Sequence, residues 1–370
     1  MVQLLGSRNR GNRRVGGRLI ATMLTAACMT AAVTSCGSSG SSGAPISLLP
    51  STTAKGDTWE WSSACRVAPH GPGGCDASGP ELAGHAQLAG NEWNLGSAAP
   101  AAAATGSLTM SVSSSGGLNL KGDLASAPPC TDRTCIAPQA NTWVRGFPSV
   151  LYGIDQCNAP TSPSQSTALR LPMKVGSIPD DLIGRSTYES QTSQITHDVA
   201  YDLWLNSSDT KSPCQTQGTL EVMVWTDHDA RSLLPDGMKV GTTTIPFAVN
   251  GKAKSANGAW SIYADNVYAG GRTAPWGGTV WLVLDDAHLV KKGTVSVDLS
   301  AALSAVGNLL QDNYQWSSSL RDTYWLDTIS FGMEYGPESA DPYGAGPTRF
   351  SLDLRSYCLD VGATVAAAAC

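Results

Sequence analysis

The chain has 370 residues, of which 42% are hydrophobic and only 15% charged, and it contains 39 glycines and 11 tryptophans. This length can fill one large domain, and the scarcity of charge beside abundant Gly, Ser, Thr and Trp favours short strands and turns over long helices. The formal charge of −6 argues against nucleic acid as a partner, because an acidic surface repels phosphates.

The N-terminus has the pattern of an export signal. An apolar run at 19–33 follows a basic segment and is too short to span a bilayer comfortably, so we expect residues 1–35 to be a cleaved leader. The basic residues are Arg8, Arg10, Arg13, Arg14 and Arg18. "VTSC" (33–36) resembles the cleavage box of bacterial lipoproteins, which would make Cys36 the lipidated first residue of the mature protein; an ordinary signal peptide is the alternative. The Gly- and Ser-rich residues 36–56 are then expected to be a flexible tether.

Loss of the leader would make the protein more acidic. It removes five arginines and no acid, which takes the formal charge from −6 to −11. We therefore expect an exported protein, either extracellular or attached to the cell membrane only through a lipid on Cys36. Such a protein fits a neutral partner and does not fit nucleic acid.

Cysteine usage agrees with export. Besides Cys28 in the leader and Cys36, eight cysteines are present, an even number that suggests up to four disulfides. The candidates are Cys65, Cys75, Cys130, Cys135, Cys157, Cys214, Cys358 and Cys370. Short spacings favour the pairs 65–75 and 130–135, and the other pairings stay open. Zinc at Cys130 and Cys135 is disfavoured because "CTDRTC" has no second cysteine pair or nearby histidine.

From residue 57 onward, alternating and apolar segments separated by Gly, Asn, Ser and Pro predict a series of strands. They cover 58–62, 106–114, 197–206, 220–225, 244–250, 259–264, 278–286 and 293–300. One helix is predicted at 300–314, where apolar residues recur at spacings of three and four and Ser300 can serve as N-cap. The predicted fold is all-β: a concanavalin-like jelly-roll sandwich of two antiparallel sheets with one α-helix, formed by residues 57–370.

Three of these strands carry an acid on the face opposite their apolar side chains. Alternation groups Glu221 with Met223 and Trp225, Asp202 with Trp204, and Glu334 with Gly332 and Ser330. Acids beside aromatic rings suit a carbohydrate cleft, because sugars stack on such rings and glycosidic cleavage uses two carboxyl groups. The alternative is that these faces are the solvated side of a sheet and that the tryptophans only cover it.

Several motifs resemble those of glycoside hydrolase family 12, the β-jelly-roll endoglucanases and xyloglucanases. "EVMVW" (221–225) is similar to the family's nucleophile strand, "FGMEYG" (331–336) to its acid/base segment, and "YDLWLN" (201–206) to its Tyr-Asp strand. Further similar segments, in the expected order, are "NEWN" (91–94), "GFPSVLYG" (146–153) and "LLPDGMKVGT" (233–242).

The resemblance implies retaining, endo-acting hydrolysis of a β-1,4-linked glucan such as cellulose, mixed-linkage glucan or xyloglucan, by a monomer without cofactor or metal. Glu221 would be the nucleophile, Glu334 the acid/base and Asp202 the residue that orients Glu221. The substrate-binding residues implied by it are Asn91, Trp93, Tyr152, Trp204, Met223 and Trp225.

Two features leave alternatives open. Met333 and Tyr335 replace the family's usual Thr and Pro around Glu334, and we expect both in or near the cleft. They motivate a second hypothesis, a non-catalytic carbohydrate-binding protein on the same fold; a structural envelope lipoprotein is a weaker one. "TDHD" (226–229) could suggest a metal site, but at the end of a strand it is expected to be a solvated polar rim of the cleft.

Overall fold

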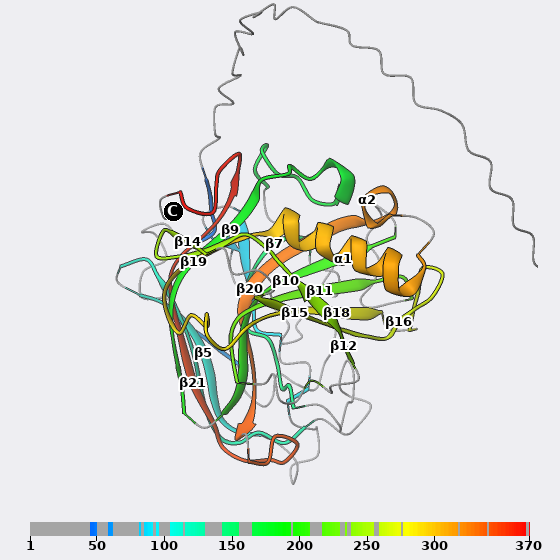
Figure 1. The fold of residues 1–370 in the computed structure, drawn as a ribbon. Coiled ribbons are helices and arrows are strands. Elements are labelled where there is room, and N and C mark those ends of the chain that lie inside the picture. The colour runs from blue at the N-terminus through cyan, green and yellow to red at the C-terminus, as the bar shows by residue number, and fades with distance from the viewer. Residues whose placement is uncertain are drawn as a thin grey trace, which may run out of the picture. The chain divides into compact units, whose positions relative to one another are not determined.

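Two large β-sheets and one main α-helix make up the part of the chain that the computed structural model describes (Figure 1). All of these elements belong to one compact unit, Ser41–Cys370. The described residues are 45–49, 58–61, 81–82, 85–91, 94–95, 104–113, 115–129, 143–154, 165–193, 195–207, 217–229, 234, 238–254, 259–274, 277–316, 319–338, 340–367 and 370.

Sheet A has the strand order β14-β13-β19-β9-β21-β6-β5-β2, and β1 also pairs with β21. Its strands are β1 (Ile46–Ser47), β2 (Thr58–Trp61), β5 (Thr105–Val112), β6 (Leu118–Ser126), β9 (Leu182–Thr192), β13 (Phe247–Val249), β14 (Lys252–Lys254), β19 (Lys292–Asp298) and β21 (Thr348–Val361). Residues 36–56 were expected to form a flexible tether. Strand β1 lies within this range and pairs with β21, so residues 45–49 belong to the folded unit.

Sheet B has the order β12-β15-β18-β11-β10-β20-β7-β4-β3, and β8 also pairs with β20. Its strands are β3 (Glu81–Leu82), β4 (Ala86–Ala89), β7 (Ser149–Gly153), β8 (Met173–Lys174), β10 (Ile195–Asn206), β11 (Leu220–His228), β12 (Lys239–Thr243), β15 (Trp260–Asp265), β18 (Gly278–Leu284) and β20 (Trp325–Glu338). The prediction of two antiparallel sheets needs one correction, because β11 and β18 run parallel and make sheet B mixed.

The main core lies on one side of sheet B and is shared with sheet A and with α1 (Leu299–Tyr314). The strand faces that enter it are the predicted ones: Tyr201, Leu203 and Leu205 of β10, Leu220, Val222 and Val224 of β11, and Ile329 and Phe331 of β20. The rings of Tyr201 and Phe331 lie 4.8 Å apart at its centre. The opposite side of sheet B is therefore left to carry the polar residues of β10, β11 and β20.

Helix α1 begins one residue earlier than predicted. Its N-cap is Asp298, whose side chain accepts a hydrogen bond of 2.8 Å from the main-chain N–H of Ala301, so Ser300 is not the cap. Strand β19 ends at Asp298 and runs directly into the helix, which places the cap at this junction. The remaining short elements are β16 (Val267–Tyr268), β17 (Arg272–Thr273), the 3₁₀ turn Val175–Ser177 and α2 (Leu320–Thr323).

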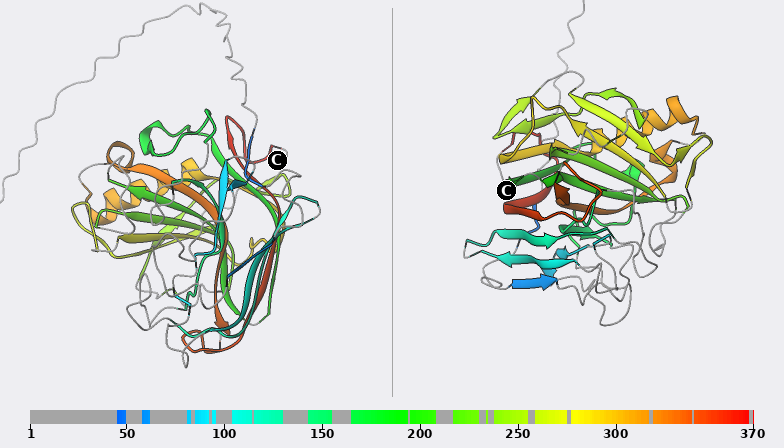
Figure 2. Two further views of the ribbon diagram at one scale, coloured as in Figure 1. Left: turned by 180° about the vertical axis from the view of Figure 1, so that it is seen from behind. Right: turned by 90° about the horizontal axis from the view of Figure 1, so that it is seen from below.

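Sheet B is bent along its strands. Figures 1 and 2 show β20 (orange) turning along its length between α2 and its far end. A register shift between β10 and β11 at Val199/Ala200, where Thr226 is the extra residue, is a β-bulge of the kind that bends strands. The bend makes the polar side of the sheet concave, so side chains far apart along one strand can converge.

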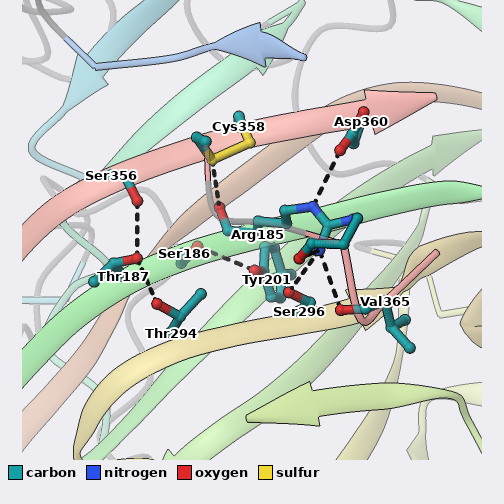
Figure 3. Close-up of a disulfide and its surroundings, with 12 residues drawn as sticks. Arg185, Ser186, Thr187, Tyr201, Thr294, Ser296, Ser356, Cys358, Asp360 and Val365 are labelled. Atoms are coloured by element: carbon teal, nitrogen blue, oxygen red, sulfur yellow. Dashed lines mark hydrogen bonds and ion pairs between the residues drawn. A yellow bond between two sulfur atoms is a disulfide. The ribbon is translucent and has the colours of Figure 1, made fainter. Parts of the chain in front are cut away.

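The C-terminus closes over a buried arginine on the outer side of sheet A (Figure 3). Arg185 of β9 is 1% exposed and forms an ion pair of 3.1 Å with Asp360. Its guanidinium donates to the hydroxyl of Ser296 and to the main-chain oxygens of Thr364, Val365 and Ala367. A disulfide between Cys358 and Cys370 ties down the end of this segment. This pairing resolves one that the spacing had left open.

The other predicted cysteine features, Cys36, Cys65, Cys75, Cys130, Cys135, Cys157 and Cys214, lie outside the described residues. The proposed leader lies outside them too. Among the helices that the structure does describe, none combines the length and the apolar character needed to cross a bilayer.

Candidate active site

The three predicted catalytic residues lie on neighbouring strands of the concave side of sheet B. Glu221 is on β11, Asp202 on β10 and Glu334 on β20, and β10 is the middle strand of the three. Alternation turns all three carboxyl groups away from the main core, because their sequence neighbours enter it. The sequence pattern therefore places these side chains on one face, and the structure brings their strands side by side.

Their register shows which groups are neighbours. Glu221 lies opposite Trp204, and Asp202 lies opposite Met223, one pair further along the same face. Glu334 lies at the other end of the site, directly opposite Asp198. The two glutamates are thus diagonal to each other across β10, and the charge of Glu221 still acts on Glu334.

A fourth carboxyl group, Asp198, was missed by sequence reasoning. It shares a face with Asp202 because the two are four positions apart on a regular strand. The signal was present in "HDVAYD" (197–202), but the motif resemblance stopped at the second aspartate. We refer to Asp198, Asp202, Glu221 and Glu334 as the carboxyl cluster.

The four groups differ in burial. Asp198 is 0% exposed, Asp202 3% and Glu334 8%, whereas Glu221 is half-buried. Glu221 and Glu334 are thus the members that solvent or a ligand reaches most readily. Asp198 lies beneath the surface of the site.

Glu221 and Asp202 each have a hydrogen-bond donor of their own. The hydroxyl of Thr279 on β18 donates to Oε2 of Glu221 at 3.0 Å, and Nε1 of Trp204 donates to Oδ2 of Asp202 at 2.8 Å. Burial raises the pKa of Glu221 to about 7, although the Thr279 hydrogen bond opposes the rise. Burial and the negative charge of Glu221 raise the pKa of Asp202 well above its usual range.

Glu334 has a different environment. Its pKa is raised well above the usual range by burial, by the charge of and a hydrogen bond with Asp198, and by the charge of Glu221. Burial raises the pKa of Asp198 to about 8, despite hydrogen bonding with Glu334. Four buried acids this close cannot all be ionised at neutral pH, so the site holds at least one proton.

This arrangement can perform acid/base and nucleophilic chemistry in one place. A half-buried carboxylate with a fixed donor can attack or stabilise a positive centre, while a buried carboxyl group with a raised pKa can donate a proton. No group of three or more His, Cys, Asp or Glu residues within the described ranges is arranged to hold a metal ion.

An apolar cluster, which we call the apolar floor, fills the concave side next to the acids. Its buried members are Trp143, Val144, Phe147, Ala200, Met223, Trp225, Leu234, Tyr263 and Val283. Met223 is 2% and Trp225 0% exposed, and Trp143 packs edge-on against Trp225 with ring centres 6.4 Å apart. The prediction that Met223 and Trp225 bind substrate directly is therefore corrected: both support the site from below.

Of the other predicted binding residues, Trp204 is partly exposed beside Glu221 and Asp202, as a cleft residue would be. Asn91 is exposed, and its main-chain oxygen accepts a 2.9 Å hydrogen bond from Phe147 of the apolar floor. Trp93 lies outside the described residues. Tyr152 was wrongly assigned: its ring is 0% exposed in the main core, and its hydroxyl contacts the main chain of Leu169 and Ser166.

Two glycines flank Glu334 on its own face and allow a close backbone approach. A Cβ at Gly332 would lie 2.3 Å from the main-chain oxygen of Pro148, and one at Gly336 would lie 2.1 Å from that of Trp143. The 143–149 segment is therefore held close against the main chain of β20 on both sides of the acid, and main-chain hydrogen bonds join the two. This contact explains the two glycines in "FGMEYG".

Met333 and Tyr335, expected in or near the cleft, are instead fully buried on the other side of β20. The ring of Tyr335 packs against Phe350 of β21, with centres 4.7 Å apart. Alternation requires this outcome, because neighbours of Glu334 must point away from its face. The two departures from the family motif thus lie in the core and not on the face that carries Glu334.

The "TDHD" stretch also differs from its prediction as a solvated rim, since Asp227 is 0% and His228 4% exposed. Asp227 and Asp229 form ion pairs of 3.5 and 3.2 Å with His197, on the core side of β10. Burial alone would lower the pKa of His197, but its interactions with the two aspartates prevail and raise it to about 9. These acids are partners of a buried cation in the bulge region.

Comparison with known proteins gives one family. The family model described as glycosyl hydrolase family 12 matches residues 84–339, which include the whole carboxyl cluster. No curated protein matches the chain by sequence.

Solved structures show a related fold. A family 12 xyloglucanase from Bacillus licheniformis, in complex with a ligand, has a TM-score of 0.51 at 14% identity, over 82% of this chain and 98% of that one. Endoglucanase 3 of Trichoderma harzianum, from the same family, has a TM-score of 0.43 at 17% identity, over 84% of this chain and 99% of that one. At such identities the xyloglucanase comparison supports the jelly-roll fold only.

Proposed function

Because the chain belongs to glycosyl hydrolase family 12 and is thereby a glycoside hydrolase, we propose that it cleaves β-1,4-linked glucans internally and with retention of configuration. The observation that carries the proposal is the placement of Glu221 and Glu334 on one concave face, on the two strands that flank β10. Each glutamate has an aspartate of β10 beside it.

In this proposal Glu221 is the nucleophile. It is the most exposed acid of the cluster, and the Thr279 hydrogen bond holds one of its oxygens in place. Its oxygen would bond to the anomeric carbon as the glycosidic bond breaks, which gives a covalent glycosyl-enzyme. Asp202, held by Trp204, would orient Glu221 from the neighbouring strand.

Glu334 is the proposed acid/base. Its raised pKa keeps it protonated at neutral pH, so it can give its proton to the departing sugar oxygen. In the second step it would take a proton from the water that hydrolyses the intermediate, and both carboxyl groups would return to their starting states.

The substrate class we propose is cellulose, mixed-linkage glucan or xyloglucan. Support comes from the family and from the partly exposed Trp204, which lies opposite Glu221 and donates to Asp202; we also propose that Asn91 and Trp93 bind the sugar chain. No cofactor enters the proposed mechanism, and we propose that the protein acts as a monomer.

The observation that suggested a non-catalytic binding protein does not hold in the structure. It rested on Met333 and Tyr335 altering the cleft beside Glu334, and both side chains lie in the core. The chain retains both glutamates on the concave face.

The experiment that tests the proposal is sugar release from a panel of soluble β-glucans by the parent protein and by the Glu221→Gln and Glu334→Gln variants. We expect internal cleavage by the parent, loss of measurable turnover in the Glu221 variant, and a decrease of about 10²–10⁴ in kcat/KM in the Glu334 variant. A partly exposed control outside the carboxyl cluster, Glu338→Gln at the end of β20, should keep parental activity. Parental activity in both site variants would overturn the assignment.

We also propose that residues 1–35 are removed on export and that Cys36 is acylated, which would attach the enzyme to the cell membrane. The support is the sequence pattern of the leader. Cys36→Ala should release the protein into the medium, and mass spectrometry of the parent's N-terminal peptide should detect the lipid. A parent peptide that starts elsewhere and carries no lipid would show ordinary secretion.

A further inference from the structure

Asp198 is the one carboxyl group of the cluster to which the proposed mechanism gives no task. It is 0% exposed and lies on β10 directly opposite Glu334, on the same side of the sheet. Opposed residues in antiparallel strands have Cβ atoms about 4.5–5.5 Å apart, which lets two short acidic side chains touch. Because no surface of Asp198 is open, it reaches a substrate only through another residue.

The environment of Asp198 offers it one hydrogen-bond partner. Within the described part of the chain no side chain other than that of Glu334 donates to its carboxyl oxygens, whereas Glu221 has Thr279 and Asp202 has Trp204; the main chain of Glu334 also hydrogen-bonds to Asp198. The carboxyl group that it meets is that of Glu334. Two carboxylates only accept, so this contact becomes a hydrogen bond when one of the two carries a proton.

The charges around the pair keep that proton in place. Asp202 on β10 and Glu221 on β11 both act on Asp198 with negative charge, and Glu221 acts on Glu334 as well. On β11, the residue opposite Asp198 is His228, whose Nε2 lies 2.8 Å from the main-chain oxygen of Leu284. The charged His197, with Asp227 and Asp229, lies on the opposite side of β10.

We propose that Asp198 is a positioning residue for Glu334: the two side chains share one proton, and the anionic Asp198 keeps it on the glutamate until the sugar oxygen departs. This inference rests on the proposed function. In the first step an oxygen of Glu221 bonds to the anomeric carbon as the C–O bond breaks, the electrons of that bond pass to the leaving oxygen, and this oxygen takes the shared proton. In the second step water bonds to the anomeric carbon, its proton returns to Glu334, and the bond to Glu221 breaks.

The pair would act in its singly protonated form, in which Asp198 is the anionic member during both steps and assists each of them. Its charge raises the proton affinity of Glu334, which favours the protonated acid at the start and makes the glutamate a stronger base for water. Asp202 serves Glu221 in the same way from the same strand. The strand β10 would thus supply one supporting aspartate to each catalytic glutamate.

The test uses Asp198→Asn, which keeps the shape and removes the charge, with two substrates that differ in leaving group. On an unactivated cello-oligosaccharide, which needs protonation, we expect kcat/KM to fall by about 10- to 100-fold. The alkaline limb of its pH profile should move down by about one pH unit, because Glu334 loses the neighbour that raises its pKa. On a dinitrophenyl β-cellobioside, whose leaving group needs no proton, kcat/KM should stay within about threefold of the parent.

Controls separate this role from a structural one. Asp202→Asn acts at the nucleophile and should slow both substrates, while Asp312→Asn, exposed on α1, should slow neither. Asp198→Ala provides a second variant if the asparagine impairs folding, and thermal unfolding verifies both. An equal loss on both substrates with an unmoved pH profile, or no loss at all, would overturn the inference; a parent that hydrolyses neither substrate would overturn the proposed function instead.

Discussion

At the scale of single residues, the buried acids that the proposed reaction needs lower the stability of the fold. Glu334 is 8% exposed and lies among three other acids. Its ionisation therefore costs more free energy in the folded protein than in the unfolded chain. A carboxyl group whose folded pKa is raised contributes full stability below its unfolded pKa and loses that contribution as the pH rises through the folded value. The carboxyl cluster should therefore make the fold less stable in alkali.

This reasoning predicts the effect of neutralising Glu334. Glu334→Gln should leave Tm unchanged at pH 4, where the carboxyl group is protonated in both states. At pH 9 it should raise Tm by roughly 2–8 °C, because the parent bears the cost of ionisation and the variant does not. Differential scanning calorimetry at the two pH values measures both. Equal Tm differences at pH 4 and pH 9 would mean that the pKa of Glu334 is not raised.

At the scale of elements, the 143–149 segment and β20 depend on each other. Gly332 and Gly336 admit the main chain of that segment on either side of Glu334, and Trp143 then covers Trp225 in the apolar floor. A methyl group at position 336 would lie 2.1 Å from the main-chain oxygen of Trp143. The backbone would have to move to relieve this clash.

Gly336→Ala is therefore expected to destabilise the protein by about 1–3 kcal/mol and to expose Trp225. Urea unfolding measures the first effect and quenching of tryptophan fluorescence by acrylamide the second. Gly241→Ala is the matched control, because a Cβ there meets nothing within 4 Å, and it should stay within about 0.5 kcal/mol of the parent. A Gly336 variant as stable as the control would show that the segment does not pack tightly on β20.

The elements also show how far sequence reasoning reached. Alternation in "LEVMVW" and "TISFGMEYG" was sufficient to predict which side chains of β11 and β20 enter the core, and the family suggested by these motifs is confirmed. Long-range partners were not predictable from alternation. Trp225 was predicted on the correct face, but it and Tyr152 are fully covered instead of binding substrate, because nothing local shows what packs over a ring. Asp198 was missed since its significance depends on the register of β10 with β20, which only the folded sheet defines.

At the scale of the whole domain, one side of sheet B serves stability and the other chemistry. Sheet A and α1 share the main core on one side, which frees the concave side for four acids and an apolar floor. The bulge at Thr226 bends strands β10 and β11, and the charge of Glu221 reaches Glu334 across the site. The fold thereby creates a proton-holding site from strands whose own sequences look like ordinary alternating β-structure.

The central claim is that Glu221 attacks the sugar, and covalent trapping tests it most directly. Incubation with a dinitrophenyl 2-deoxy-2-fluoro-β-cellobioside slows the hydrolysis of a glycosyl-enzyme, so that the label accumulates on the nucleophile. Peptide mass spectrometry should then locate one fluoro-cellobiosyl group on Glu221 of the parent and none on Glu221→Gln. A label on Glu334 or Asp202, or an active enzyme that is never labelled and releases inverted product, would contradict the account.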